Sequence, residues 1–68
     1  MGKYTLKMLR ARDNLTQKEV AKKIGVSEMT YLNWEKGKSY PGVPSILKLE
    51  KLFNVAFADI KFLIWISV

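Results

Sequence analysis

The sequence predicts an all-α fold of five short helices, because three observations agree. Apolar residues recur at three- and four-residue spacing in successive segments. Residues that begin or end helices stand between these segments, and no alternation typical of strands occurs before the last few residues. The chain has 68 residues, enough for one domain, so the five helices should share one small core over residues 1–68.

The first two helices have recognisable ends. The first is expected over residues 5–13, with Thr5 as its N-cap. Thr16 stands three residues before Glu19, which is the capping-box pattern, so the second helix should begin near Gln17. It should end at Gly25, which can adopt the left-handed conformation of a C-terminal cap.

The third and fourth helices follow from the same signals. Ser27 is the N-cap candidate of a third helix that runs through Lys36 and is closed by Gly37. Residues 38–43 contain Ser, Pro and Gly and are expected to form a loop. Pro44 suits the first turn of the fourth helix.

A fifth helix is expected over Phe57–Leu63, with Ile60 and Leu63 on its apolar side. The expected helices then span residues 5–63, and an apolar tail follows. That tail alternates like a short strand, so it could pair with the tail of a second protomer or pack within its own monomer, with Trp65 near Tyr4. Its candidate dimer contacts are Ile64, Trp65, Ile66 and Val68.

The charge favours a polyanionic partner. Twelve basic residues against six acidic ones give a net charge of +6, which indicates nucleic acid or a membrane surface, the alternative being a soluble protein with a basic face. The chain has no cysteine and no histidine, so disulfides, thiolate metal sites and histidine bases are excluded. We therefore expect no metal, no cofactor, no small-molecule ligand and no enzymatic activity.

The two ends of the chain predict a cytoplasmic protein without a membrane partner. The N-terminal segment has no apolar stretch typical of a secretory signal. The C-terminal FLIWISV is too short to span a bilayer.

Residues 17–36 carry the most informative pattern. Two short helical segments are separated by GVS, with the small Ala21 where the helices must approach closely, which is typical of a helix-turn-helix unit. Such a unit serves DNA binding, although the same packing also serves protein contacts. The apolar positions that would hold it together are Val20, Ile24, Val26, Tyr31 and Trp34.

The run LTQKEVAKKIGVSEMTYLNWEKGKSYP resembles the Xre-like family of phage repressors, Cro proteins and related bacterial regulators. The resemblance implies a five-helix repressor-like domain that binds double-stranded operator DNA in the major groove as a homodimer. Tyr31 departs from the family pattern, because a smaller aliphatic residue is usual there. By position, the resemblance implies a phosphate contact at Gln17, base contacts at Glu28, Met29 and Asn33, and an ion pair between Arg10 and Glu35.

Helical geometry gives a separate argument about the third helix. At about 100° per residue, Tyr31, Trp34 and Glu35 fall on one side. The aromatic side is the better core, so the opposite side should face outward, where a helix in the major groove reads base edges. That outward side carries Glu28, Met29, Leu32, Asn33 and Lys36.

Four of these outward residues have a possible role in reading bases, and each has an alternative. Asn33 can pair with adenine or be a merely solvated polar residue, and Glu28 can accept from a cytosine amino group but is otherwise repelled by phosphates. Met29 and Leu32 can cover thymine methyl groups or fill space against neighbouring loops.

Phosphate contacts are expected from the start of the second helix, at Gln17, and from Lys36. A second anchoring group follows the third helix at Lys38, Ser39 and Tyr40, whereas Lys22 and Lys23 fit a solvated face. If Arg10 contacted a phosphate instead, Glu35 would be buried alone, so we interpret the pair as structural.

These features predict a DNA-binding transcriptional regulator, of the repressor or Cro-like kind found in phages and mobile elements. The alternative from another class is a protein-interaction module on the same scaffold, such as an anti-repressor, because Glu28, Met29 and Leu32 would also fit a protein surface. An antitoxin role would still be DNA binding, and the sequence does not separate it.

Overall fold

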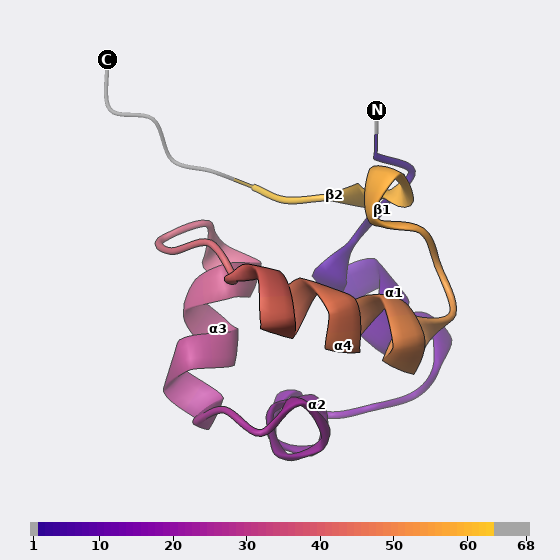
Figure 1. Ribbon diagram of the computed structural model, residues 1–68. Coiled ribbons are helices and arrows are strands. Elements are labelled where there is room, and N and C mark those ends of the chain that lie inside the picture. The colour runs from indigo at the N-terminus through magenta and orange to yellow at the C-terminus, as the bar shows by residue number, and fades with distance from the viewer. Residues whose placement is uncertain (1, 64–68) are drawn as a thin grey trace.

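The computed structural model describes residues 2–63 as a mostly helical domain (Figure 1). Four α-helices form its body, and two short strands flank them. In chain order the elements are β1 (Tyr4–Thr5), α1 (Leu6–Arg12), α2 (Gln17–Ile24), α3 (Glu28–Lys36), α4 (Val43–Phe53), the 3-10 turn η1 (Phe57–Asp59) and β2 (Ile60–Lys61).

Side chains close the N-terminal ends of the first three helices, as the sequence predicts. Thr5 accepts a hydrogen bond from the Met8 backbone and caps α1. At α2 the capping box is complete, since Thr16 Oγ1 accepts from Glu19 N at 3.1 Å and Thr16 N donates to Glu19 Oε1 at 2.8 Å. Each of these caps satisfies a backbone group that the helix leaves without an internal partner.

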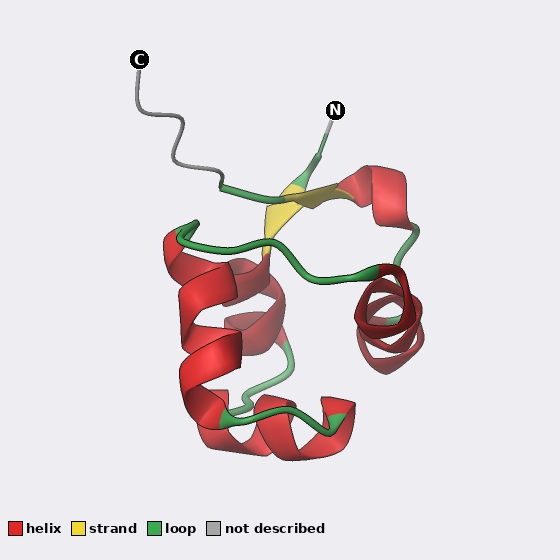
Figure 2. Cartoon of the chain, turned by 60° about the vertical axis from the view of Figure 1, so that its left-hand side comes forward, coloured by secondary structure: helices red, strands yellow, loops and turns green. Residues whose placement is uncertain are grey.

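Two glycines end α2 and α3 in the left-handed conformation. Gly25 has φ of 85° and Gly37 has φ of 76°. Residues with a Cβ rarely adopt such angles, so these positions favour glycine. Gly25 stands where the chain turns from α2 toward α3, and α2 lies across one end of α3 rather than alongside it (Figure 2).

The core lies where α1, α2, α3 and α4 meet, with Ile60 of β2 closing one end. Val20 and Ala21 of α2 and Tyr31 and Trp34 of α3 belong to this one buried cluster. The small Ala21 is only 2 % exposed, which fits the close approach of the two helices expected from the sequence. The buried apolar residues are Leu6, Leu9, Val20, Ala21, Ile24, Tyr31, Trp34, Leu49, Phe53 and Ile60.

The prediction of a fifth helix is wrong. The chain makes a single 3-10 turn over Phe57–Asp59 and then extends, so that β2 pairs in parallel with β1, Tyr4 facing Ile60 in register. Burial follows a period of two, because Ile60 is buried, Lys61 is exposed and the next residue is half-buried. A helix would have buried Leu63 with Ile60, but Leu63 is 44 % exposed.

The predicted tail contacts Ile64, Trp65, Ile66 and Val68 lie outside the described residues. Among the residues that are described, no helix is both long enough and apolar enough to cross a membrane.

Candidate nucleic-acid interface

The outward side of α3 presents the residues that the helical geometry assigns to it. Glu28, Met29 and Lys36 are exposed, and Met29 leaves 64 % of its surface open. Leu32 and Asn33 are half-buried at the centre of this side. The face therefore combines an amide, a carboxylate and apolar groups, the types of side chain that read base edges in a major groove.

The inward side of α3 is fixed by its two aromatic residues. Tyr31 is fully buried and Trp34 is 5 % exposed, and their rings meet edge to face with centroids 6.1 Å apart. This packing determines the rotation of α3 about its own axis. The rotation in turn keeps Glu28, Met29 and Asn33 at the surface.

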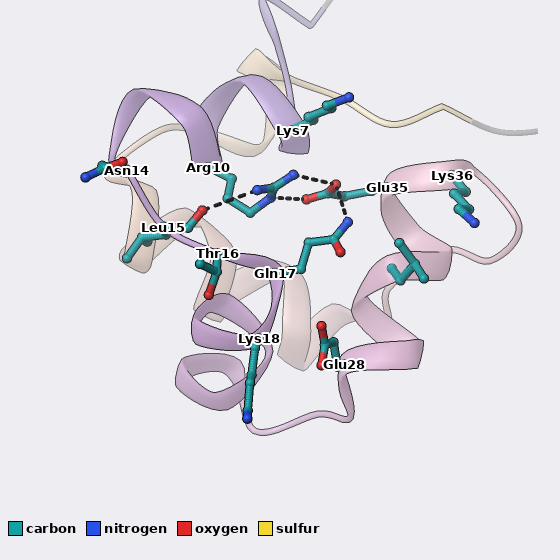
Figure 3. Close-up of a pocket in the computed structure, with 11 residues that line it drawn as sticks. Lys7, Arg10, Asn14, Leu15, Thr16, Gln17, Lys18, Glu28, Glu35 and Lys36 are labelled. Carbon is teal, nitrogen blue, oxygen red and sulfur yellow. Dashed lines mark hydrogen bonds and ion pairs between the residues drawn. The ribbon is translucent and has the colours of Figure 1, made fainter.

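An ion pair joins α1 to α3 beside this aromatic packing. Arg10 Nε donates to Glu35 Oε2 at 2.7 Å, and Arg10 Nη2 donates to Glu35 Oε1 at 3.2 Å (Figure 3). The third guanidinium nitrogen, Nη1, donates to the Leu15 carbonyl at 3.3 Å. The expected pair is thus present, with its side chains 18 % and 5 % exposed for Arg10 and Glu35.

Gln17 extends this network to the start of α2, a contact that the sequence analysis missed. Its amide nitrogen donates to Glu35 Oε1 at 3.1 Å. Burial alone would raise the pKa of Glu35, but hydrogen bonds from Arg10 and Gln17 and the nearby Tyr31 hydroxyl hold it below its ordinary value. Burial raises the pKa of Tyr31 strongly, and its hydroxyl has no hydrogen-bond partner among the described residues.

The first turn of α2 leaves backbone donors for an outside partner. The capping box uses the N–H groups of Thr16 and Glu19, and Val20 N makes the first bond inside the helix, to Thr16 O at 3.1 Å. The N–H groups of Gln17 and Lys18 precede that bond, so they belong to the set that a helix cannot satisfy internally. Such groups attract anions, which makes Gln17 a suitable phosphate contact.

The loop after α3 is held to that helix by its backbone. Lys38 N donates to Asn33 O at 2.9 Å, while the side chains of Lys38 and Ser39 are exposed. Tyr40 is 45 % exposed, and its ring lies 4.8 Å from that of Phe62, centroid to centroid. The predicted second anchoring group is therefore at the surface, directly after the C-terminal end of α3.

A groove of about 600 Å³ lies between α1, the start of α2 and α3. The groove is lined by the Arg10, Gln17 and Glu35 network and by three lysines, which are Lys7, Lys18 and Lys36 (Figure 3). Lys7 and Lys18 were not among the contacts predicted from the sequence. The spacing of Lys7 and Arg10, one helical turn apart on α1, could have indicated that they share a face.

Comparison with known proteins gives a consistent picture. Residues 6–60 match the family profile described as "Helix-turn-helix". The chain is 47 % identical over 58 residues to an uncharacterized HTH-type transcriptional regulator of Methanocaldococcus jannaschii, covering 85 % of this chain and 88 % of that protein.

Two further relatives carry more specific names. The cryptic phage CTXphi transcriptional repressor RstR of Vibrio cholerae is 42 % identical over 52 residues, covering 76 % of this chain and 47 % of the relative. The HTH-type transcriptional activator BcrR of Enterococcus faecalis is 36 % identical over 55 residues, covering 81 % of this chain and 27 % of the relative. The chain belongs to the Xre-like helix-turn-helix family.

Proposed function

We propose that the protein is a DNA-binding transcriptional regulator that reads the major groove with the outward side of α3. The observation that carries this proposal is the rotation of α3. Tyr31 and Trp34 are buried, so Glu28, Met29 and Asn33 face outward together. Every relative described above is named as a transcriptional regulator, which supports the same function.

Specific readout would come from the outward side of α3. The Asn33 amide can donate to and accept from one adenine edge, and Glu28 can accept from a cytosine amino group. Met29 and Leu32 can cover thymine methyl groups. The strong exposure of Met29 supports this role over a role as internal filler.

Phosphate contacts from two groups of residues would orient this face. One group is Gln17 with the backbone at the start of α2, and the other is Lys36 in the last turn of α3 with Lys38, Ser39 and Tyr40 after it. If four to six phosphates are contacted, the affinity should fall with salt at a log–log slope of about −4 to −5 per subunit.

We propose repression as the regulatory outcome, in the manner of a phage or mobile-element repressor. The similarity to RstR supports repression, whereas the weaker similarity to BcrR shows that the same domain also occurs in an activator. A reporter gene with the selected DNA site placed over its promoter tests this point. Expression should fall when the protein is present, and a rise would show activation.

We also propose that the DNA-bound form is a homodimer. One α3 covers only a few base pairs, and two copies could place their α3 helices in successive major grooves. The aromatic patch (Tyr40, Phe57 and Phe62) is a suitable contact, in which the Phe62 ring centroid lies 4.8 Å from that of Tyr40 and 5.9 Å from that of Phe57. Apart from Met8 and Met29, the exposed large apolar side chains of residues 2–63 all lie between Tyr40 and Leu63.

Sedimentation of three forms tests the dimer: the intact chain, the Phe57→Lys variant, and a chain truncated after Leu63. Dissociation of the Phe57→Lys variant alone would support the aromatic patch. Dissociation of the truncated chain alone would assign the contact to residues 64–68. A monomeric intact chain at micromolar concentration, with and without DNA, would contradict the homodimer.

Selection from a pool of random-sequence duplexes tests the function itself. The protein should enrich one family of sites and bind it far more tightly than a shuffled duplex, with the salt slope given above. Weak binding that is insensitive to salt would contradict the DNA proposal. It would favour a protein-interaction module, for which exposed Met29 and Leu32 would be the contact surface.

A further inference from the structure

The groove between α1, α2 and α3 has a cationic rim and a neutral floor. Lys7, Lys18 and Lys36 come from three different helices and lie around it (Figure 3). Among the described residues, none of the three lysines has a carboxylate within ion-pair distance. Four positive and two negative side chains line the groove, so its charge is positive even with Glu28 at its edge.

Arg10 does not supply free positive charge to this groove. All three of its guanidinium nitrogens donate to internal acceptors, two to Glu35 and one to the Leu15 carbonyl. Glu35 cancels its charge at close range. On the α1 side of the groove, the cation without a carboxylate partner is therefore Lys7, which is exposed and lies one turn before Arg10.

The floor of the groove, formed by Arg10, Gln17 and Glu35, has no net charge but is polar, and it is suited to an oxyanion. The Gln17 amide nitrogen uses one hydrogen for Glu35 Oε1, and its second hydrogen remains for an outside acceptor. Because a carboxylate only accepts hydrogen bonds, Glu35 also fixes which end of the amide faces it. Glu35 is thus a positioning residue for Gln17.

The groove is continuous with the outward side of α3, because Glu28, Leu32 and Lys36 belong to both. A molecule bound along the outward side of α3 would therefore also lie against the groove. We propose that the groove seats a backbone phosphate of the bound DNA and that Lys7 is its clamp on α1. This inference rests on the proposed function, and it extends the DNA contact beyond the helix-turn-helix unit to the first helix.

Salt-dependent binding to a random-sequence duplex tests this inference, because phosphate contacts do not depend on sequence. In fluorescence-anisotropy titrations, Lys7→Gln should make the log–log salt slope shallower by about 0.9 and weaken binding about eightfold at 0.1 M salt. Lys7→Arg should bind like the wild type. Lys7 makes no side-chain hydrogen bond within residues 2–63, so the thermal melt of Lys7→Gln should match the wild type.

The matched control is Lys51→Gln, which removes the same charge from the exposed part of α4. Lys51 lies with Lys23 and Lys48 around a separate hollow, away from the groove. Its salt slope should equal that of the wild type. Equal slopes for Lys7→Gln and Lys51→Gln would overturn the inference while leaving the proposed function intact, and a wild type without salt-dependent DNA binding would overturn the proposed function itself.

Discussion

Replacing Arg10 by methionine should destabilise the protein strongly, because Glu35 would remain buried without its ion-pair partner. The Glu35 side chain is 5 % exposed, and its remaining hydrogen bond would be the one from Gln17, at 3.1 Å. Breaking a pair as buried as this costs about 3 kcal/mol or more. A domain of this length has a total stability of only about 3–10 kcal/mol, so the loss is a large part of it.

Thermal unfolding followed by circular dichroism measures this effect. A loss of about 3 kcal/mol should lower the melting temperature by about 12–24 °C for a domain of this size. The double variant Arg10→Met/Glu35→Leu should recover much of the loss, because it removes the uncompensated carboxylate and keeps an apolar volume.

The control for this experiment is Asp13→Asn. Asp13 pairs with Arg12 at 2.8 Å, but the two side chains are 43 % and 32 % exposed for Arg12 and Asp13, so the change should leave the melting temperature close to that of the wild type. A normal melting temperature for Arg10→Met, combined with weak DNA binding, would refute the structural role. It would make Arg10 a phosphate contact instead.

Three further changes test the local structure around the interface. Thr16→Ala removes the side-chain half of the capping box and should cost about 1 kcal/mol in denaturant unfolding. Gly25→Ala places a Cβ at φ of 85° and should cost about 1 kcal/mol, whereas Gly25→Asn should cost less, because asparagine adopts the left-handed conformation more readily than alanine; equal effects would contradict the conformational argument. The lowered folded-state pKa of Glu35 stabilises the protein above its unfolded pKa of about 4.3, and that contribution is lost as the pH falls through the lower folded value. Acid unfolding should therefore be less steep in Arg10→Met/Glu35→Leu than in the wild type, and identical pH profiles would argue against a contribution from Glu35.

Local signals predicted α1 to α4 well. Thr16 with Glu19, Ser27, Gly25 and Gly37 act within one turn of their own position, so the sequence around each is enough to place a helix end. The aromatic side of α3 follows from helical periodicity alone, and Tyr31 and Trp34 are buried as predicted.

The end of the domain could not be predicted in this way, because its conformation depends on the start of the chain. Residues 60–61 extend to pair with β1, and Lys3 N donates to Asp59 O at 2.9 Å. The backbone at Gly2 lies so close to β2 that a Cβ there would collide with the backbone of Lys61. Such contacts join segments far apart in the sequence, and apolar spacing within residues 57–63 carries no information about them.

Polar contacts between helices were also missed for the same reason. Gln17 donates to Glu35, Arg12 Nη2 donates to Phe53 O at 2.6 Å, and Lys48 Nζ donates to Ile24 O at 3.2 Å. Each depends on how two helices are placed relative to each other. Only the Arg10–Glu35 pair was expected, because the family resemblance supplied it.

The central claim, that the outward side of α3 reads DNA sequence, is tested most directly by comparing Asn33→Ala with Lys38→Ala. Each variant is titrated against the selected duplex and against a shuffled duplex. Asn33→Ala should lose about 1–3 kcal/mol on the selected duplex and almost nothing on the shuffled one, whereas Lys38→Ala should weaken both alike and make the salt slope shallower. If both variants lose affinity equally on the two duplexes, Asn33 does not read a base, and the proposed role of α3 is contradicted.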